Sequence, residues 1–206
     1  MRMGPRAASI AVLCLVWAAP AAADRASVEA AAYGGYSMSP PTTSFMTVCH
    51  GFGCRYRAEL ALTPADHAAL KRLMAAGKGS AIKERGAVAA AGAWFDKRIS
   101  AVADTKGHVA RANRDYMFNS AGQFDCIDSS RNTTSLLLLL DELGLLKYHT
   151  VAEPEARGHM IDFRPLHATA VLVEKATGVK WSIDAWTRAY GQAPEVMPLA
   201  RWMDLD

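Results

Sequence analysis

The sequence predicts one domain of mixed composition, in which helices come first and a small antiparallel sheet follows. Three observations support this prediction. A chain of 206 residues is long enough for one domain with a substantial core and short for two. Helical signals dominate residues 63–143, whereas residues 145–184 show the alternation and turn signals of strands. With 51% hydrophobic residues, the chain is neither disordered nor fibrous.

The first 23 residues have the features of a secretory signal. Arg2 and Arg6 precede an apolar run at residues 10–19, and three alanines at 21–23 provide a small-residue cleavage site. The run is too short to span a bilayer comfortably. We therefore expect a mature protein that begins near Asp24, in the periplasm or secreted, with no integral membrane segment. An uncleaved anchor is the alternative.

The charge of the chain gives no indication of a nucleic-acid partner. The formal charge is +3, but residues 1–23 contain two arginines and no acidic residue, so the mature chain carries +1 (21 basic minus 20 acidic residues). After cleavage no cluster of lysine and arginine with interleaved aromatic residues remains. The sequence gives no indication of an oligomeric state.

The first elements are a loose segment, a strand and two helices. Residues 24–54 are small and polar and predict an irregular N-terminal arm, and a short strand is expected at 55–62. The sequence Thr-Pro-Ala-Asp at 63–66 predicts the capped start of a helix that ends at about residue 76. A second helix is expected at 80–102. We expect the whole of residues 55–206 to form a single domain.

A third helix is expected over residues 127–143, directly after Cys126. It contains five consecutive leucines, Leu136 to Leu140, and Gly144 marks its end. Because the helix is apolar on nearly all sides there, it should be the central buried helix of the domain. Asp125 or a nearby group is expected to cap its start.

The remaining chain predicts strands and an irregular tail. A strand is expected at 145–151, a loop at 152–165, and a hairpin whose strands are 167–173 and 179–184. The aromatic tail at 185–202 is expected to be irregular and to wrap the sheet edge.

The hairpin brings two polar side chains to one face of the predicted sheet. Registers that centre its turn oppose His167 to either Asp184 or Trp186. In both registers His167 and Asp184 point from the same face and are direct or diagonal neighbours. His159 is a rival base, but it lies in a segment with no partner strand.

Three cysteines remain in the mature chain, two of them close together. Cys49 and Cys54 flank a segment with two glycines, which permit the tight bend of a short bridge, and we predict that they form a disulfide. A metal site at Cys49, His50 and Cys54 is less favoured, because the spacing matches no standard zinc pattern. This pairing leaves Cys126 unpaired, as either a reactive or a buried inert thiol. A bridge from Cys126 to Cys49 or Cys54 is the alternative.

Cys126, His167 and Asp184 are the residue types that nucleophilic cysteine chemistry needs. A helix N-terminus stabilises negative charge and so favours the thiolate of Cys126. His167 can take and return the proton, and Asp184 can fix the orientation of its ring. The backbone N–H of Cys126 is placed to donate to an oxyanion. The candidates for a second donor are Gln123, Asn119 and Tyr116.

These residues resemble the transglutaminase-like superfamily, with the bacterial transglutaminase-like cysteine peptidases as the nearest members. The resemblance covers residues 110–190 and rests on Asp-Cys-Ile-Asp at 125–128 and Leu-Asp-Glu-Leu-Gly at 140–144. Ser129-Ser130 departs from the aromatic or small pair, often Tyr-Ala, that usually follows the family's motif. The resemblance implies an α+β, papain-like or transglutaminase-like fold in which the cysteine helix packs on an antiparallel sheet.

The same resemblance implies that Cys126, His167 and Asp184 are the catalytic residues. Some family peptidases bind calcium through acids that flank the cysteine, so Asp125 and Asp128 are candidate ligands. Apart from calcium no cofactor is expected. The expected function is an exported cysteine hydrolase, a peptidase or amidase that acts on a protein or peptide through an acyl-thioester, with transamidation as a variant. The alternative is a non-catalytic domain of this fold that binds a protein or a cell-wall component.

Overall fold

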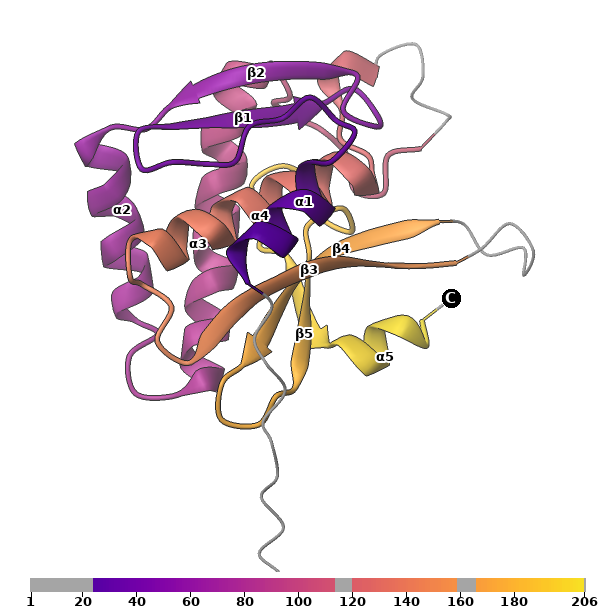
Figure 1. Cartoon of the computed structure of the whole chain (residues 1–206). Coiled ribbons are helices and arrows are strands. Elements are labelled where there is room, and N and C mark those ends of the chain that lie inside the picture. The colour runs from indigo at the N-terminus through magenta and orange to yellow at the C-terminus, as the bar shows by residue number, and fades with distance from the viewer. Residues whose placement is uncertain (1–23, 114–119, 159–165, 206) are drawn as a thin grey trace, which may run out of the picture.

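The computed structural model describes residues 24–113, 120–158 and 166–205. In this part of the chain the fold is α+β, with a four-stranded antiparallel sheet in the order β3-β4-β5-β6 and a two-stranded sheet, β1-β2 (Figure 1). The elements are α1 (Arg25–Tyr33), β1 (Phe45–His50), β2 (Tyr56–Ala61), α2 (Pro64–Ala75), α3 (Ala81–Ala103), α4 (Cys126–Glu142), β3 (His149–Arg157), β4 (His167–Glu174), β5 (Lys180–Asp184), β6 (Glu195–Pro198) and α5 (Leu199–Met203). The predicted signal, residues 1–23, lies outside the described residues.

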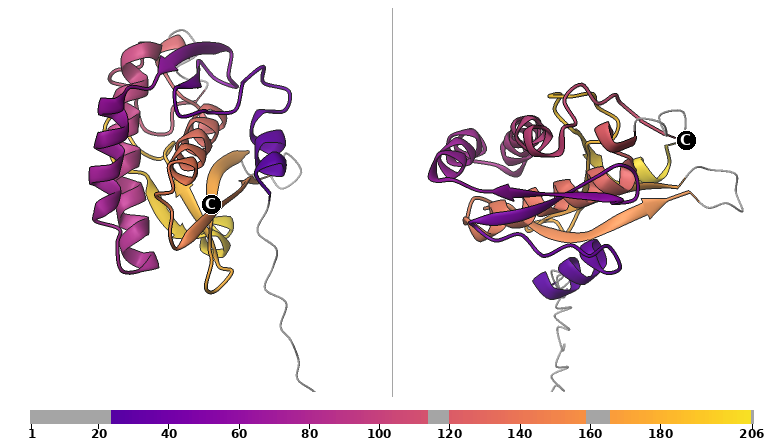
Figure 2. Two further views of the ribbon diagram at one scale, coloured as in Figure 1. Left: turned by 60° about the vertical axis from the view of Figure 1, so that its left-hand side comes forward. Right: turned by 90° about the horizontal axis from the view of Figure 1, so that it is seen from above.

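Helix α4 is the centre of the molecule. It contacts β4 and β3 on one side and β1 on the other. Figure 2 shows α2 and α3 together on one side of α4 and α1 on the opposite side. The five leucines at 136–140 are all buried, as predicted, because sheet and helices surround this part of α4.

Helices α2 and α4 begin at the caps that the sequence predicts. Thr63 Oγ1 accepts a hydrogen bond from Asp66 N, and Asp66 Oδ2 accepts one from Thr63 N, which completes the capping box of α2. At α4, Asp125 and Asp128 exchange the same pair of bonds. The predicted cap at Asp125 is therefore confirmed, and Cys126 becomes the first residue of the helix.

The prediction that residues 24–54 form an irregular arm is wrong. Asp24 caps α1 by accepting a hydrogen bond from Ser27 N, and Tyr33 bonds Ser135 of α4 through its hydroxyl at 2.9 Å. Val28 lies among the core residues. The small residues of this segment allow α1 to lie close to α4. The segment has no long apolar stripe that would predict a helix, and tertiary contacts stabilise α1 instead.

The first strand of the large sheet starts later and ends later than predicted. Residues 145–148 precede β3, and the Glu84 carboxylate accepts hydrogen bonds from the backbone N–H groups of Lys147 and Tyr148 and from that of His149, the first residue of the strand. The strand then continues to Arg157, with a register irregularity between Ala152 and Glu155. This irregularity accommodates Pro154, which has no N–H for the sheet.

The tail is ordered rather than irregular. Residues 195–198 form β6 and pair with β5, and α5 follows. Trp202 of α5 is completely buried and packs with Val171 and Leu199 in a second apolar cluster. The tail therefore completes the sheet instead of wrapping its edge.

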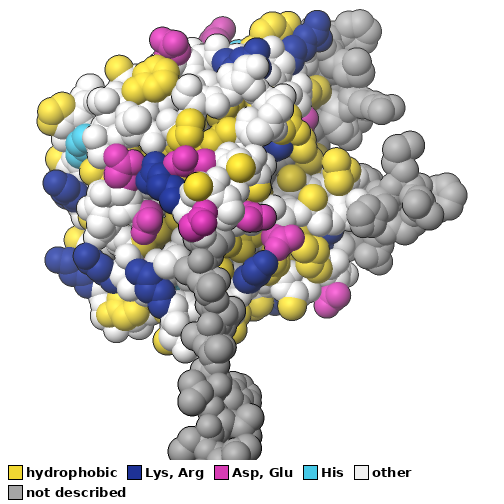
Figure 3. Space-filling view, viewed as in Figure 1, with side chains coloured by type: hydrophobic (Ala, Val, Ile, Leu, Met, Phe, Trp, Pro, Cys, Tyr) yellow, Lys and Arg dark blue, Asp and Glu magenta, His cyan; other side chains and the backbone are white. Residues whose placement is uncertain are grey.

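Within the described residues, no helix combines the length and apolarity needed to span a bilayer. On the face shown in Figure 3, acidic and basic side chains are interspersed over the surface that α1 occupies in Figure 1. Arg25 of α1, for example, pairs with Glu29 and with Glu142 of α4.

Candidate active site

Cys126 lies at the N-terminal end of the central helix. As the first residue of α4 it follows the Asp125 cap, and its side chain is 7% exposed. Its Sγ donates to the backbone oxygen of Leu166, the residue before β4, at 3.6 Å. The thiol therefore lies at the contact between α4 and the start of β4.

His167 and Asp184 meet as the hairpin spacing predicts. His167 is the first residue of β4 and Asp184 the last residue of β5. Ala170 opposes Ile183, and this register, when continued, opposes His167 to Trp186. His167 Nε2 donates to Asp184 Oδ2 at 2.6 Å, and both side chains are buried. The prediction that the two residues share a face is confirmed.

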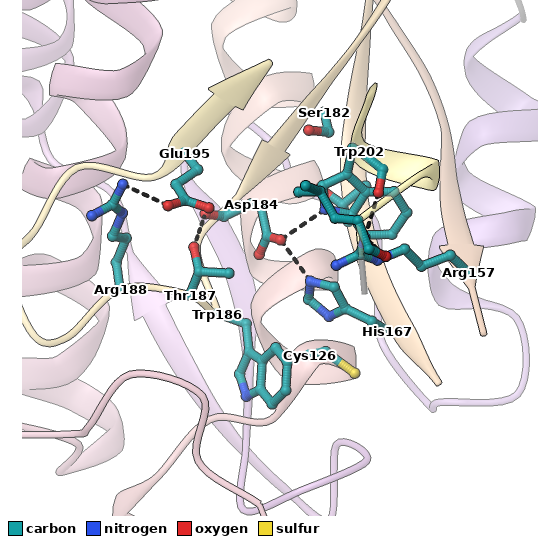
Figure 4. A network of polar contacts seen from close by, with 12 residues as sticks. Cys126, Arg157, His167, Ser182, Asp184, Trp186, Thr187, Arg188, Glu195 and Trp202 are labelled. Carbon is teal, nitrogen blue, oxygen red and sulfur yellow. Dashed lines mark hydrogen bonds and ion pairs between the residues drawn. The ribbon is translucent and has the colours of Figure 1, made fainter. Parts of the chain in front are cut away.

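The other ring nitrogen of His167 points toward the thiol. In Figure 4 the His167 ring lies between Asp184 and Cys126, with the edge that carries Nδ1 turned toward Cys126. Nδ1 is buried and has no hydrogen-bond partner among the described residues, so no bond joins it to Sγ in this geometry. A neutral imidazole that donates through Nε2 carries its lone pair on Nδ1.

Two indole rings hold the imidazole. Trp186 and Trp202 have ring centroids 4.7 Å and 5.1 Å from that of His167. Trp202 Nε1 also donates to Asp184 Oδ2 at 2.9 Å, so this one oxygen accepts from both His167 and Trp202. The carboxylate is thereby fixed from two directions.

The thiol of Cys126 is protonated in the resting site. Burial raises the pKa of Cys126 to about 11, and the negative charges of Asp125 and Asp184 act in the same direction. Backbone N–H groups of Ala168 and Cys126 oppose the rise without cancelling it. The sequence predicts that the helix terminus favours the thiolate, but burial has the larger effect on the pKa of Cys126.

One of the three candidates for a second oxyanion donor lies within the described residues. Gln123 is buried, and its Oε1 accepts a hydrogen bond from Val109 N at 2.9 Å, which orients the amide. Tyr116 and Asn119 lie outside the described residues, as does the rival base His159. Gln123 Nε2 remains a donor close in sequence to Cys126.

The predicted disulfide between Cys49 and Cys54 is confirmed, and Cys126 is a free thiol. The bridge closes a loop that lies against the N-terminus of α4. Its backbone N–H groups donate to both acids beside Cys126: Phe52 and Cys54 to Asp128, and Gly53 to Asp125.

Asp125 and Asp128 do not fit a calcium site. Their four carboxylate oxygens all accept hydrogen bonds from backbone N–H groups, two of these within the capping box and three from the disulfide loop. A cation would have to displace these donors. Burial and the neighbouring Asp125 raise the pKa of Asp128 to about 7, against the lowering effect of the N–H donors. In the described ranges, no three His, Cys, Asp or Glu side chains gather as a metal site.

Trp202 is a residue of the site that was not predicted from the sequence. The signal was present, because Leu199, Trp202 and Met203 follow Pro198 with the apolar spacing of one helical turn. What the pattern could not indicate is that the indole N–H would reach Asp184.

The Trp202–Asp184 hydrogen bond should stabilise the fold. We expect Trp202→Phe to lower the free energy of unfolding by about 2–3 kcal/mol, since it removes a donor to a buried carboxylate. Trp181→Phe on β5 is the matched control, because the buried Nε1 of Trp181 makes no hydrogen bond within the described part of the chain. Urea unfolding of both variants measures the difference. Equal losses would show that the indole N–H contributes nothing beyond packing.

Comparison of the chain with protein-family models, with curated proteins and with solved structures finds no match.

Proposed function

We propose that this protein is an exported cysteine hydrolase, a peptidase or amidase that works through a Cys126–His167–Asp184 triad. One observation carries the proposal. His167 binds Asp184 through Nε2, which leaves the lone pair of Nδ1 directed toward the only free thiol of the described chain. A thiol, a base that faces it and a carboxylate that orients the base are the arrangement that activates a sulfur nucleophile.

The proposed reaction begins with proton transfer. Nδ1 of His167 takes the Cys126 proton as Sγ attacks the carbonyl carbon of the substrate. The oxyanion that forms is bound by the backbone N–H of Cys126, with the Gln123 amide as the second donor. Asp184 stabilises the imidazolium through the hydrogen bond to Nε2.

The second half of the reaction returns the proton and releases the product. Imidazolium Nδ1–H protonates the leaving amine, and the carbon–nitrogen bond breaks to leave an acyl-thioester on Cys126. His167 then deprotonates a water molecule that attacks the thioester, which frees the acid and restores the thiol. An amine in place of water would give transamidation.

Fold and location are consistent with this proposal. A buried cysteine helix against an antiparallel sheet is the arrangement implied by the resemblance to papain-like, transglutaminase-like proteins. The disulfide fits an oxidising compartment, such as the periplasm or the cell exterior. A protein or peptide is the proposed substrate, and the reaction uses no cofactor.

Alkylation of Cys126 by iodoacetamide tests the proposal. We expect Cys126 to react at neutral pH despite the raised thiol pKa, because His167 assists removal of the proton. His167→Ala should slow the reaction about 100-fold, within the usual range for a general base. Peptide mass spectrometry follows the labelling of Cys126 alone.

The control replaces a different buried histidine. His108→Ala removes an imidazole that pairs with Asp96 instead of facing Cys126, so labelling of Cys126 should be unchanged. If wild-type Cys126 reacts slowly and His167→Ala leaves the rate unchanged, the catalytic assignment fails.

A further inference from the structure

The loop closed by Cys49 and Cys54 binds Asp125 and Asp128, the two acidic residues that flank Cys126, through backbone hydrogen bonds. Phe52 N donates to Asp128 Oδ2 at 2.8 Å, Gly53 N to Asp125 Oδ2 at 2.7 Å, and Cys54 N to Asp128 Oδ1 at 2.6 Å. Three successive backbone donors thus converge on two buried or half-buried carboxylates. Such consecutive N–H groups form a concave binding site for anionic oxygens.

The backbone of this loop is in a conformation that needs external support. Gly51, Phe52, Gly53 and Cys54 have φ angles of 84°, 71°, 64° and 60°. Glycine tolerates this left-handed region, but a phenylalanine and a cysteine adopt it at a conformational cost. The loop therefore holds this shape because the disulfide closes it and the carboxylates bind it.

The first half of the loop is also tied to the candidate site. The Asn132 side chain of α4 accepts from Cys49 N and donates to Cys49 O, each at 2.8 Å. Gly51 N donates to the backbone oxygen of Gln123 at 3.0 Å. The loop thus positions the helix turn that carries Cys126 and, through its backbone, the candidate oxyanion donor Gln123.

We infer that formation of the Cys49–Cys54 disulfide switches the site on, because only the closed loop aligns Cys126 and Gln123 with His167. The inference rests on the proposed hydrolase function. Phe52, Gly53 and Cys54 are positioning residues in this scheme, acting through backbone N–H groups. Without the bridge, the strained loop opens and the start of α4 loses three of the donors that fix it.

The activating step is thiol–disulfide exchange with a small or protein disulfide as oxidant. The thiolate of one cysteine attacks the oxidant and releases its first thiol, and the second cysteine then attacks the mixed disulfide and releases the other. The Cys49–Cys54 bond forms, two electrons pass to the oxidant, and its two sulfurs leave as thiols with the two protons.

Activation of this kind is effectively one-way. Cys49 is 0% exposed and Cys54 is 2% exposed, so a reductant does not reach the bridge in the folded protein. Met38 lies against Cys49, with its sulfur 3.0 Å from Sγ. The chain is therefore inactive while its cysteines are reduced, as in a cytoplasm, and becomes active once it folds in an oxidising compartment.

A double-mutant cycle tests the inference. The rate of Cys126 alkylation by iodoacetamide is measured for wild type, Cys49→Ala/Cys54→Ala, and each of these with His167→Ala. In the oxidised protein His167→Ala should slow labelling about 100-fold, and without the disulfide the same change should slow it less than about 10-fold. The quantity compared is the ratio of the labelling rate with His167 intact to the rate with His167→Ala, in each background. Absolute rates are not compared, because loss of the bridge also exposes Cys126.

A second variant breaks the contact and keeps the bridge. Asp125→Ser retains a capping oxygen for Asp128 N but removes Oδ2, which binds Gly53. In Asp125→Ser, His167→Ala should slow the labelling of Cys126 by a smaller factor than in the wild type. This test does not depend on whether Cys49→Ala/Cys54→Ala folds. Asp24→Ser makes the same change at the cap of α1, where Asp24 Oδ1 accepts from Ser27 N, and should leave unchanged the factor by which His167→Ala slows labelling.

The outcomes separate this inference from the proposed function. A ratio near one in the oxidised wild type overturns both. A ratio of about 100 that persists in Asp125→Ser, or in folded Cys49→Ala/Cys54→Ala, overturns the inference and leaves the hydrolase intact. Circular dichroism at the labelling temperature establishes which variants are folded.

Discussion

Replacing Asp184 by Leu should lower the rate at which Cys126 is acylated by about 10⁴-fold, whereas Asp184→Asn should lower it by only about 10²-fold or less. The difference follows from the geometry of the carboxylate. His167 Nε2 and Trp202 Nε1 both donate to a single oxygen, Oδ2. An asparagine can place its amide oxygen there, keep both bonds and preserve the tautomer of His167, losing only the charge that stabilises the imidazolium.

Leucine removes the acceptor as well as the charge. Two buried N–H groups then lose their partner, and the ring of His167 is no longer held with Nδ1 toward Cys126. The burst of nitrophenol from a p-nitrophenyl ester measures acylation, with circular dichroism to show that each variant is folded. An equal loss of acylation rate in the two variants would contradict the proposal that both N–H groups bind one oxygen. An unchanged rate in both would show that Asp184 has no role in acylation.

Glu84→Gln should lower the free energy of unfolding by about 3–5 kcal/mol, the largest stability change that we expect for a single conservative substitution in this protein. Glu84 is buried in α3 and accepts hydrogen bonds from three successive backbone N–H groups and from His149 Nδ1. Both carboxylate oxygens are used. A glutamine must therefore turn its NH₂ group toward at least one backbone donor.

The change also affects a connected group of side chains, because the His149 ring that binds Glu84 also binds Arg85. Arg85 binds Glu174 and His149 in the same buried cluster, and its guanidinium stacks on Trp181 at 3.5 Å. Urea unfolding measures the change, and Glu59→Gln at an exposed position of β2 should alter stability by less than about 0.5 kcal/mol. A loss below 1 kcal/mol at Glu84 would mean that water replaces the carboxylate contacts.

Much of the fold was predictable where local signals agree with the final packing. The caps at Thr63 and Asp125 and the leucines of α4 gave helices at the right places, because cap and apolar face act within one element. The hairpin was equally predictable, since its short turn leaves two registers and both bring His167 and Asp184 to one face.

The remainder depends on partners that are distant in sequence. At the start of β3, Glu84 accepts from the N–H of His149, 65 residues later, and from those of the two residues before it. Trp202 belongs to the site because its indole reaches Asp184, which no periodicity encodes. The pKa of Cys126 likewise reflects burial by β4 instead of its helix position alone, and burial of one side chain cannot be derived from local sequence.

The disulfide loop also sets an order of assembly. Its two cysteines are five residues apart, so ring closure costs little chain entropy and can precede the rest of folding. The carboxylates that bind it lie 72–76 residues further along the chain, and Trp202 comes after every other residue of the site. A chain that emerges from its N-terminus therefore presents the loop first and the stabilising indole last, and the Cys126–His167–Asp184 site is completed only after nearly the whole domain has emerged.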